Sequence, residues 1–219
     1  MPSSMSLSSI FLVLEHSLPE LLTNSTFRAS QVNPMRCYNA STHRFCRVRL
    51  QVSCLPADNP QQSEESSHAG VNANCKCRRC RKGGPPELRE SDEGYHELYT
   101  CGTVRRTVAD TRSELQEQLR LACLGVEKPI SSSQTRTGIK DKIARHWIDK
   151  LLTRSRELKV MHPGIPEADL VRDGLAWLET QTSQPMNPLL NVPNLDPHRD
   201  TPVELLHTWL LGVVKYVWH

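Results

Sequence analysis

Three cysteines lie within a short basic segment, Cys75-Lys-Cys77-Arg-Arg-Cys80. The Cys-x-x-Cys spacing of Cys77 and Cys80 allows two thiolates to bind one zinc ion, and a structural zinc site needs four ligands. The chain has no second Cys-x-x-Cys, so the other ligands must come from elsewhere. The candidates are His68, His96, Cys101, His198 and His207. The sequence predicts a zinc site here, and the alternative is an incidental cysteine cluster in a basic loop.

The same segment carries a cluster of cations. They are Lys76, Arg78, Arg79, Arg81 and Lys82. Such a cluster predicts contacts with the phosphates of nucleic acid, although a net charge of +3 is too small to argue for this partner alone. The alternative is a solvated loop that pairs with the acidic residues after it. These are Glu87, Glu90, Asp92, Glu93 and Glu97.

Two further places could contribute metal ligands. Asp58, the first aspartate in the chain, lies between Pro56 and Pro60. It is either a turn residue or a metal-binding carboxylate displayed at the end of a strand. Glu204 and His207 are three residues apart and share one face of a helix. Glu204 also has a structural interpretation, as the acid of a capping box.

A strand is predicted immediately before Asp58. From Cys46 to Cys54 the sequence alternates between apolar or cysteine positions and polar ones, and this period of two is typical of a strand. Pro56 ends the strand because proline cannot donate to a sheet ladder. We therefore expect Asp58 just past the strand end, partly exposed and with no strong structural partner for its carboxylate.

Four helices are predicted after the cysteines. A capping box at Thr111–Glu114 opens the first, which runs to about Leu124, and its buried face carries Leu115, Leu119 and Ala122. The second covers 138–159, with cations on its other faces and an apolar row of Ile139, Ile143, Trp147 and Leu151. The third opens at Pro166, with Leu170, Gly174 and Trp177 on one side. The last covers 201–219 and is apolar on most faces, which predicts burial.

The expected fold class is α+β, mostly helical with a small β-sheet. We divide the chain into five parts. These are a weakly structured leader (1–43), a strand and loop (44–75), a zinc-motif and helical region (76–184), a proline-rich linker (185–200) and a buried C-terminal helix (201–219).

The eight cysteines raise the alternative of a secreted disulfide protein. No Lys or Arg precedes Arg28, and the apolar run at Ser9–Leu14 is too short for an export signal. No apolar stretch approaches the roughly 20 residues that a membrane span needs. We therefore expect reduced cysteines, no membrane partner and a nuclear or cytoplasmic protein that is not secreted.

Three blocks of this sequence resemble recurrent blocks of one family. They are LPADNPQQSEESSHAGVNANCKCRRCRKGG, GYHELY and DPHRDTPVELLHTWLLGVVKYVW. In that order they resemble the DDE transposases of the CACTA group, most closely the Plavaka type of fungal genomes, over about residues 40–219. The resemblance is specific within the blocks and vague between them.

The resemblance implies an RNase H-like core interrupted by a helical insert, with residues 44–75 as a remnant of that core. In the intact family three acidic residues hold two Mg²⁺ or Mn²⁺ ions for phosphodiester transfer in DNA transposition. Asp58 matches the second of these residues. Cys77-x-x-Cys80 opens the insert and Glu204-x-x-His207 closes it. By analogy with the vertebrate antigen-receptor recombinase, Cys77, Cys80 and His207 would bind zinc, with His198 or Glu204 as the fourth ligand.

The chain also departs from the family pattern. No aspartate precedes Asp58, a third acidic residue would lie beyond His219, and Glu204 stands where the motif has Asp or Cys. One carboxylate cannot hold two Mg²⁺ ions. We therefore expect a truncated middle portion, inactive by itself, which binds DNA non-specifically and associates with itself or with an intact transposase. The alternative is a small zinc-binding module for DNA or protein interaction, without catalysis.

Overall fold

The computed structural model describes residues 34–48, 54–99, 104–202, 209–210 and 213–217. The chain divides into two units, one of residues 1–53 with 191–194 and one of residues 54–190 with 195–219. The protein is mostly helical with one small antiparallel sheet, which confirms the α+β class at that level. Among the described residues, no helix is long and apolar enough to cross a membrane.

The first unit contains a β-hairpin of β1 (Met35–Asn39) and β2 (Arg44–Val48). The Asn39 side chain accepts the backbone N–H groups of Ser41 at 3.0 Å and Thr42 at 3.2 Å, which closes the turn between the strands. The predicted alternation holds over the described part of β2, where Cys46 and Val48 are half-buried and Arg47 is exposed. The predicted strand continued to Cys54, but 49–53 lie outside the described residues and Cys54 is not in a strand.

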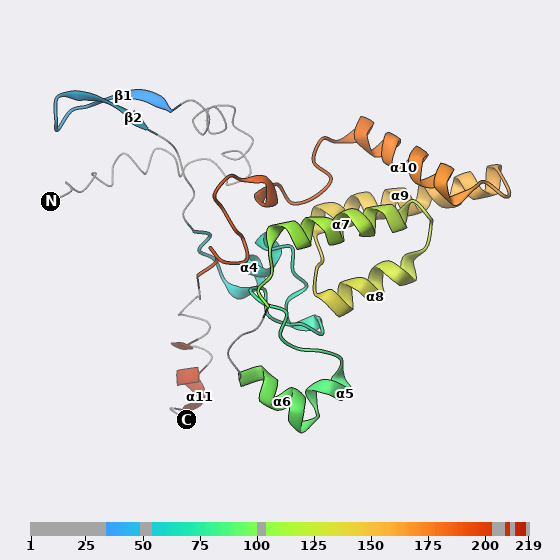
Figure 1. Cartoon of the computed structure of the whole chain (residues 1–219), viewed down its shortest axis with the longest axis horizontal. Coiled ribbons are helices and arrows are strands. Elements are labelled where there is room, and N and C mark those ends of the chain that lie inside the picture. The colour runs from blue at the N-terminus through green and yellow to red at the C-terminus, as the bar shows by residue number, and fades with distance from the viewer. Residues whose placement is uncertain (1–33, 49–53, 100–103, 203–208, 211–212, 218–219) are drawn as a thin grey trace. The chain divides into compact units, whose positions relative to one another are not determined.

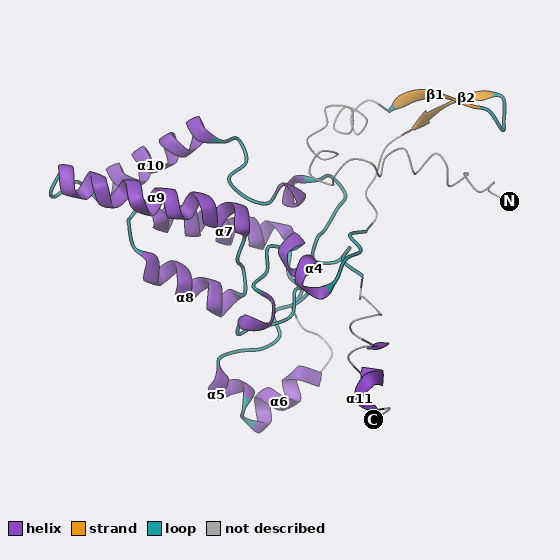
Figure 2. Cartoon of the chain, turned by 180° about the vertical axis from the view of Figure 1, so that it is seen from behind, coloured by secondary structure: helices purple, strands orange, loops and turns teal. Residues whose placement is uncertain are grey.

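The second unit is built on four helices, α7 (Val108–Ala122), α8 (Glu127–Thr137), α9 (Lys142–Met161) and α10 (Glu167–Gln181). In Figures 1 and 2 α7 lies alongside α9, and α7 also contacts α8 and α10. Their buried faces and the adjoining segments share one core, which consists of Leu115, Leu119, Ala122, Cys123, Ile130, Ile139, Ala144, Ile148, Leu151, Leu152, Leu178, Met186 and Leu190. The predicted burial of Leu115, Leu119 and Ala122 is confirmed.

Two helix starts differ from the prediction. Thr107, rather than Thr111, caps α7, and its hydroxyl accepts the N–H of Asp110 at 3.1 Å. Asp141 caps α9 and accepts the N–H of Ala144 at 2.6 Å. Thr111 is instead buried inside the fold, so the capping-box pattern was local coincidence. By contrast, α10 begins directly after Pro166 as predicted, with Leu170 and Gly174 buried.

The predicted apolar row of α9 is confirmed in part. Ile148, Leu151 and Leu152 are buried, whereas Ile143 remains 41% exposed. Steps of four residues advance slightly more than one turn of 3.6 residues, so a row at every fourth position winds gradually around the helix and does not follow one face. Along the predicted row Ile143 therefore lies outside the core, Trp147 packs partly against it and Leu151 is buried in it.

Short elements make up the rest of the second unit. They are α4 (Asn59–Glu65), η1 (Gly70–Asn72), α5 (Pro86–Arg89), α6 (Asp92–Tyr99), η2 (Pro188–Asn191) and α11 (Lys215–Val217). Residues 185–200 do not form an exposed linker, because many of them are buried: Met186, Asn187, Leu189, Leu190, Leu195, Pro197 and His198. The apolar residues supply the burial, and the prolines only interrupt regular helix.

The predicted C-terminal helix is only partly described. Most of its described apolar side chains are exposed, by 56% for Trp209, 51% for Leu210 and 76% for Val217. The prediction that this helix is buried is therefore wrong for these residues. Apolar character all round a helix indicates a missing partner as readily as a buried position.

Candidate metal centre

The cysteine loop, residues 75–80, runs between η1 and α5 and pairs with the strand-like segment 104–106. Arg81 N–H donates to Val104 O at 3.1 Å, and Arg106 N–H donates to Arg79 O at 3.0 Å. Cys80 and Arg105 form an isolated antiparallel bridge. This pairing brings the side chain of Arg106 within hydrogen-bonding distance of the loop's carbonyl groups.

Arg106 is the centre of the loop's hydrogen bonding. The residue is only 4% exposed. Its Nε donates to the carbonyls of Cys77 at 2.9 Å and Cys80 at 3.1 Å, and Nη2 donates to the carbonyl of Cys75 at 3.2 Å. Burial lowers the pKa of Arg106, while the neighbouring cysteines raise it. A guanidinium offers five donors in a fixed plane, so one side chain holds all three cysteine carbonyls in one arrangement.

His68 lies beside Arg106 and also contacts the cysteine loop. Gly70 N–H donates to Nδ1 at 2.9 Å, so the ring proton lies on Nε2, which donates to Cys75 O at 2.9 Å. Burial and the positive charge of Arg106 lower the pKa of His68 to about 4. The ring is therefore neutral at neutral pH, and both nitrogens are used within the fold.

The Cys77 and Cys80 side chains are hydrogen-bonded to each other, and the Cys77 sulfur also accepts the N–H of Arg79 at 3.4 Å. Burial alone would raise the pKa of Cys77. The hydrogen bonds from Arg79 and Cys80, together with the charge of Arg106, outweigh burial and lower it. A thiolate is the form that binds metal, so the pair is suited to supply two zinc ligands.

The segment 195–202 returns from the far end of the chain to the cysteine loop. His198 Nδ1 donates to the carbonyl of Arg78 at 3.0 Å, and its Nε2 accepts from the Thr111 hydroxyl at 2.8 Å. The Arg78 guanidinium donates to Thr201 Oγ1 at 3.1 Å and also to Gln62 Oε1. The loop is thereby joined to α4, to α7 and to the residues just before Glu204.

The remaining zinc ligands are not assembled among the described residues, where no group of three His, Cys, Asp or Glu side chains is placed to hold a metal. His207, Glu204 and Cys101 lie outside the described residues. His198 uses both ring nitrogens elsewhere, which disfavours it as the fourth ligand in this arrangement. The structure thus brings together Cys77 and Cys80 and leaves His207 untested.

Asp58 does not have the environment that we expected. It is the N-cap of α4, and its Oδ1 accepts the N–H of Gln61 at 2.9 Å. The expectation of a carboxylate without a structural partner is therefore wrong, because Asp58 caps a helix. Glu65, at the other end of α4, has a pKa that burial raises, with a smaller contribution from the charge of Asp58. The described residues place no cluster of carboxylates around Asp58.

The five predicted nucleic-acid contacts divide into different environments. Arg78 is committed to Thr201, Asn59 and Gln62, so its role is structural. Arg81 forms an ion pair with Asp110 at 3.0 Å. Lys76 and Arg79 are exposed, and Lys82 is half-buried. The Arg78 guanidinium is thus already hydrogen-bonded within the fold, and phosphate contact by these five cations stays a prediction.

The basic side of α9 is balanced by acids. Arg145 pairs with Glu127 at 2.7 Å, and Lys142 pairs with Glu64. Arg154 pairs with Asp173 at 2.9 Å. Exposed pairs of this kind contribute little stability, but they reduce the free positive charge that the sequence suggested.

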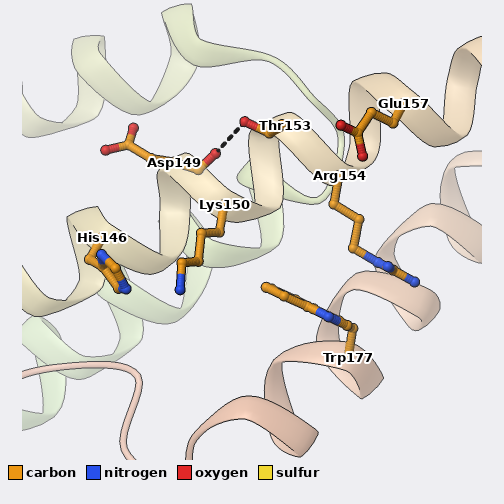
Figure 3. Close-up of a pocket in the computed structure, with 7 residues that line it drawn as sticks. All are labelled: His146, Asp149, Lys150, Thr153, Arg154, Glu157 and Trp177. Atoms are coloured by element: carbon orange, nitrogen blue, oxygen red, sulfur yellow. Dashed lines mark hydrogen bonds between the residues drawn. The ribbon is translucent and has the colours of Figure 1, made fainter.

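An open groove of about 460 Å³ lies on α9 and α10, apart from the cysteine loop. Its lining consists of His146, Asp149, Lys150, Thr153, Arg154, Glu157 and Trp177. Figure 3 shows Lys150 and Arg154 extending from α9 toward the Trp177 ring. Lys150 Nζ is 4.7 Å from the Trp147 ring centre, and the Arg154 guanidinium is 5.6 Å from that of Trp177. No predicted site residue lines this groove, and its acids and bases balance.

Comparison of the chain with protein-family models, with curated proteins and with solved structures finds no match. The function of this chain is therefore inferred from its residues and their contacts. Among these, sequence analysis missed Arg106, because nothing in VRRTVAD distinguishes it from an exposed arginine. It named His68 only as one of several ligands, without its part in holding the loop.

Proposed function

We propose that this chain is a portion of a Plavaka-type, CACTA-group DDE transposase-like protein. In this proposal the cysteine loop and the segment 195–207 join the two ends of a helical insert around a structural zinc ion. The intact family performs DNA transposition by phosphodiester transfer, and the hairpin of the first unit would be a remnant of its RNase H-like core. DNA, a second copy of the chain and an intact transposase are the proposed partners, in the nucleus or cytoplasm.

One observation carries this proposal. The first and last resembling blocks contact each other directly, although the contacting residues are 120 or more positions apart in the chain. Leu55 N–H donates to Asp200 O at 2.8 Å, and Gln62 Nε2 donates to Pro202 O at 2.6 Å. A motif that opens an insert and one that closes it should meet in space if a shared metal joins them. The contacts of Arg78 with Thr201 and of His198 with Arg78 O support that arrangement.

Zinc fits the chemistry of the loop. Cys77 and Cys80 supply two ligands, and the lowered pKa of Cys77 favours the thiolate. His207 follows Pro202 by five residues, a distance that an extended chain spans within about 18 Å. The metal would supply no chemistry beyond cross-linking these segments, while Arg106 and His68 hold the loop in place around it.

Metal analysis of the purified full chain tests this proposal. We expect one Zn²⁺ per chain, lost in the Cys77→Ser/Cys80→Ser double variant and weakened in His207→Ala. Cys54→Ser is the matched control, because Cys54 is exposed and outside the loop. The far-ultraviolet circular dichroism of each variant shows whether the helices persist. Unchanged zinc content in the double variant would refute the metal site.

A small zinc-binding interaction module without catalysis is the second candidate. The cap contact of Asp58 favours it, since this carboxylate has a structural use independent of Mg²⁺ or Mn²⁺. The genomic sequence on both sides of the coding region separates the two. Upstream strands ending in aspartate and a downstream helix carrying glutamate would support the transposase, whereas unrelated flanking sequence would support the module.

A further inference from the structure

We propose that one face of the β1–β2 hairpin binds single-stranded nucleic acid. This site is separate from the cysteine loop and does not depend on zinc. In the hairpin register Arg36 pairs opposite Arg47, and Tyr38 pairs opposite Phe45. Residues opposite each other, and residues two apart on one strand, point to the same face of a sheet. The four side chains therefore form a single face, here called the Arg–aromatic face, and all four are exposed.

The charge of this face lacks local compensation in the sequence. Five arginines and no Asp or Glu occur from Leu21 to Ala57. Two arginines directly opposite each other destabilise a hairpin, and an isolated hairpin is only marginally stable. A structural role for this pair would favour an acid at one of the two positions. A polyanionic ligand instead turns the repulsion into attraction, because its phosphates lie between the two guanidinium groups.

The aromatic pair favours unpaired bases among the polyanions. Tyr38 is 56% exposed and Phe45 is 63% exposed, with ring centroids 5.5 Å apart and planes tilted by 67°. The Arg36 guanidinium lies 4.2 Å from the centre of the Phe45 ring, which aligns a charge beside the aromatic surface. Exposed aromatic rings beside cations are the elements by which proteins stack bases and neutralise phosphates of single strands. Duplex DNA keeps its base faces stacked inside, so it could use the arginines but not the rings.

The orientation of Tyr38 is supported from the turn. Its hydroxyl is 3.2 Å from Nδ1 of His43, which has a positive φ of 50° in the turn between the strands. The opposite face of the hairpin offers a matched comparison. Arg44 has the same charge but pairs opposite Asn39, and it points away from the two rings.

Fluorescence anisotropy of the full chain with a labelled 15-nucleotide oligothymidylate tests the site. We expect Tyr38→Leu/Phe45→Leu to weaken binding at least tenfold, and Tyr38→Trp/Phe45→Trp to retain or improve it. Arg36→Gln/Arg47→Gln should weaken binding and reduce the magnitude of the log–log salt slope by about 1.4. Arg44→Gln should change the affinity less than twofold. The Trp variant also shows whether a loss in the Leu variant reflects an unfolded hairpin.

Three outcomes would overturn the proposal. One is that the Leu variant binds oligothymidylate within twofold of the unaltered chain. Another is that a 15-base-pair duplex, or vesicles with 30% phosphatidylserine, bind the chain as tightly as oligothymidylate does, and that replacing Tyr38 and Phe45 does not change this affinity. The third is a loss of affinity that appears only in Lys76→Gln/Arg79→Gln, which would place nucleic acid on the cysteine loop. Zinc content in these hairpin variants should equal that of the unaltered chain, so the two sites are tested independently.

Discussion

Arg106 Nε lies 2.9 Å from the carbonyl oxygen of Cys77, at the first residue of the Cys-x-x-Cys pair. The same side chain also holds the carbonyls of Cys75 and Cys80. The main chain of the candidate metal loop is thus fixed by one buried cation from a segment 29 residues downstream. These bonds use only carbonyl oxygens, so Arg106 holds the main chain of the loop without engaging the sulfur atoms of Cys77 and Cys80.

Replacing Arg106 should loosen the loop. Arg106→Met leaves the carbonyls of Cys77 and Cys80 without this donor, while the carbonyl of Cys75 keeps only His68. We expect the free energy of unfolding to fall by roughly 3 kcal/mol, with weaker zinc binding. Arg106→Lys keeps the charge but not the planar set of donors, so it should recover less than half of the loss. The exposed neighbour is the control, and Arg105→Met should change either quantity little. Urea denaturation and zinc titration measure both effects, and equal behaviour of the two Met variants would contradict this role.

His68 should make the protein sensitive to mild acid. Its pKa is about 4 in the folded state and near 6.5 when unfolded, because burial and Arg106 disfavour the imidazolium. Between these values the unfolded chain binds more protons than the folded one, so stability falls as the pH drops from 6.5 to 4. The contribution is roughly 3 kcal/mol over that range. His198, whose pKa burial also lowers, acts in the same direction.

The pH dependence of urea unfolding for metal-free protein measures this effect. In His68→Gln the slope between pH 6.5 and 4 should decrease, and the slope that remains combines His198 with the other groups whose pKa burial shifts, including Glu65 and Asp141. His162→Gln is the control, because His162 is exposed at the end of α9. An unchanged slope in His68→Gln would show that His68 is not the group that titrates.

Gly138 connects α8 to the candidate site. Its φ is +75°, and a Cβ atom there would lie 2.6 Å from His68 Nε2 and 2.9 Å from Cys75 O. Gly138→Ala should therefore displace the histidine and cost roughly 3 kcal/mol of unfolding free energy, combining backbone strain with steric overlap. Gly164 has a φ of +88° with no heavy atom within 4 Å of such a Cβ. Gly164→Ala isolates the strain, at about 1 kcal/mol, and thermal denaturation of the two variants should differ accordingly.

Substitutions at Asp58 separate capping from metal binding. Asp58→Ala should lower the unfolding free energy by about 1 kcal/mol, whereas Asp58→Ser retains a capping oxygen and should stay within a few tenths of it. If capping is the only role of Asp58, 5 mM Mg²⁺ or Mn²⁺ will change the unfolding free energy of the unaltered chain, Asp58→Ala and Asp58→Ser equally. None of the three will nick supercoiled DNA. Metal-dependent nicking that disappears in Asp58→Ser would instead assign this carboxylate a catalytic role.

The sequence by itself determined the features that arise from neighbouring residues. Pro166 predicted the start of α10, Leu115 and Leu119 the core face of α7, and Cys46 to Val48 the alternation of a strand. These patterns depend on one residue's conformational limits or on the period of one element. The proximity of Cys77 and Cys80 likewise follows from their spacing of three residues.

The tertiary structure decided which polar residues are buried and what they contact. Arg78 and Arg106 are both arginines beside the cysteines in sequence or space, yet each is occupied by groups from distant segments. Their partners depend on which distant segments fold back against the cysteine loop. Arg78, for example, contacts Thr201, which is 123 residues away in the chain. A charged side chain has the same local pattern whether exposed or buried, and only its distant partners offset the cost of removing it from water. For that reason the loop's supporting residues became visible only once the segments were brought together.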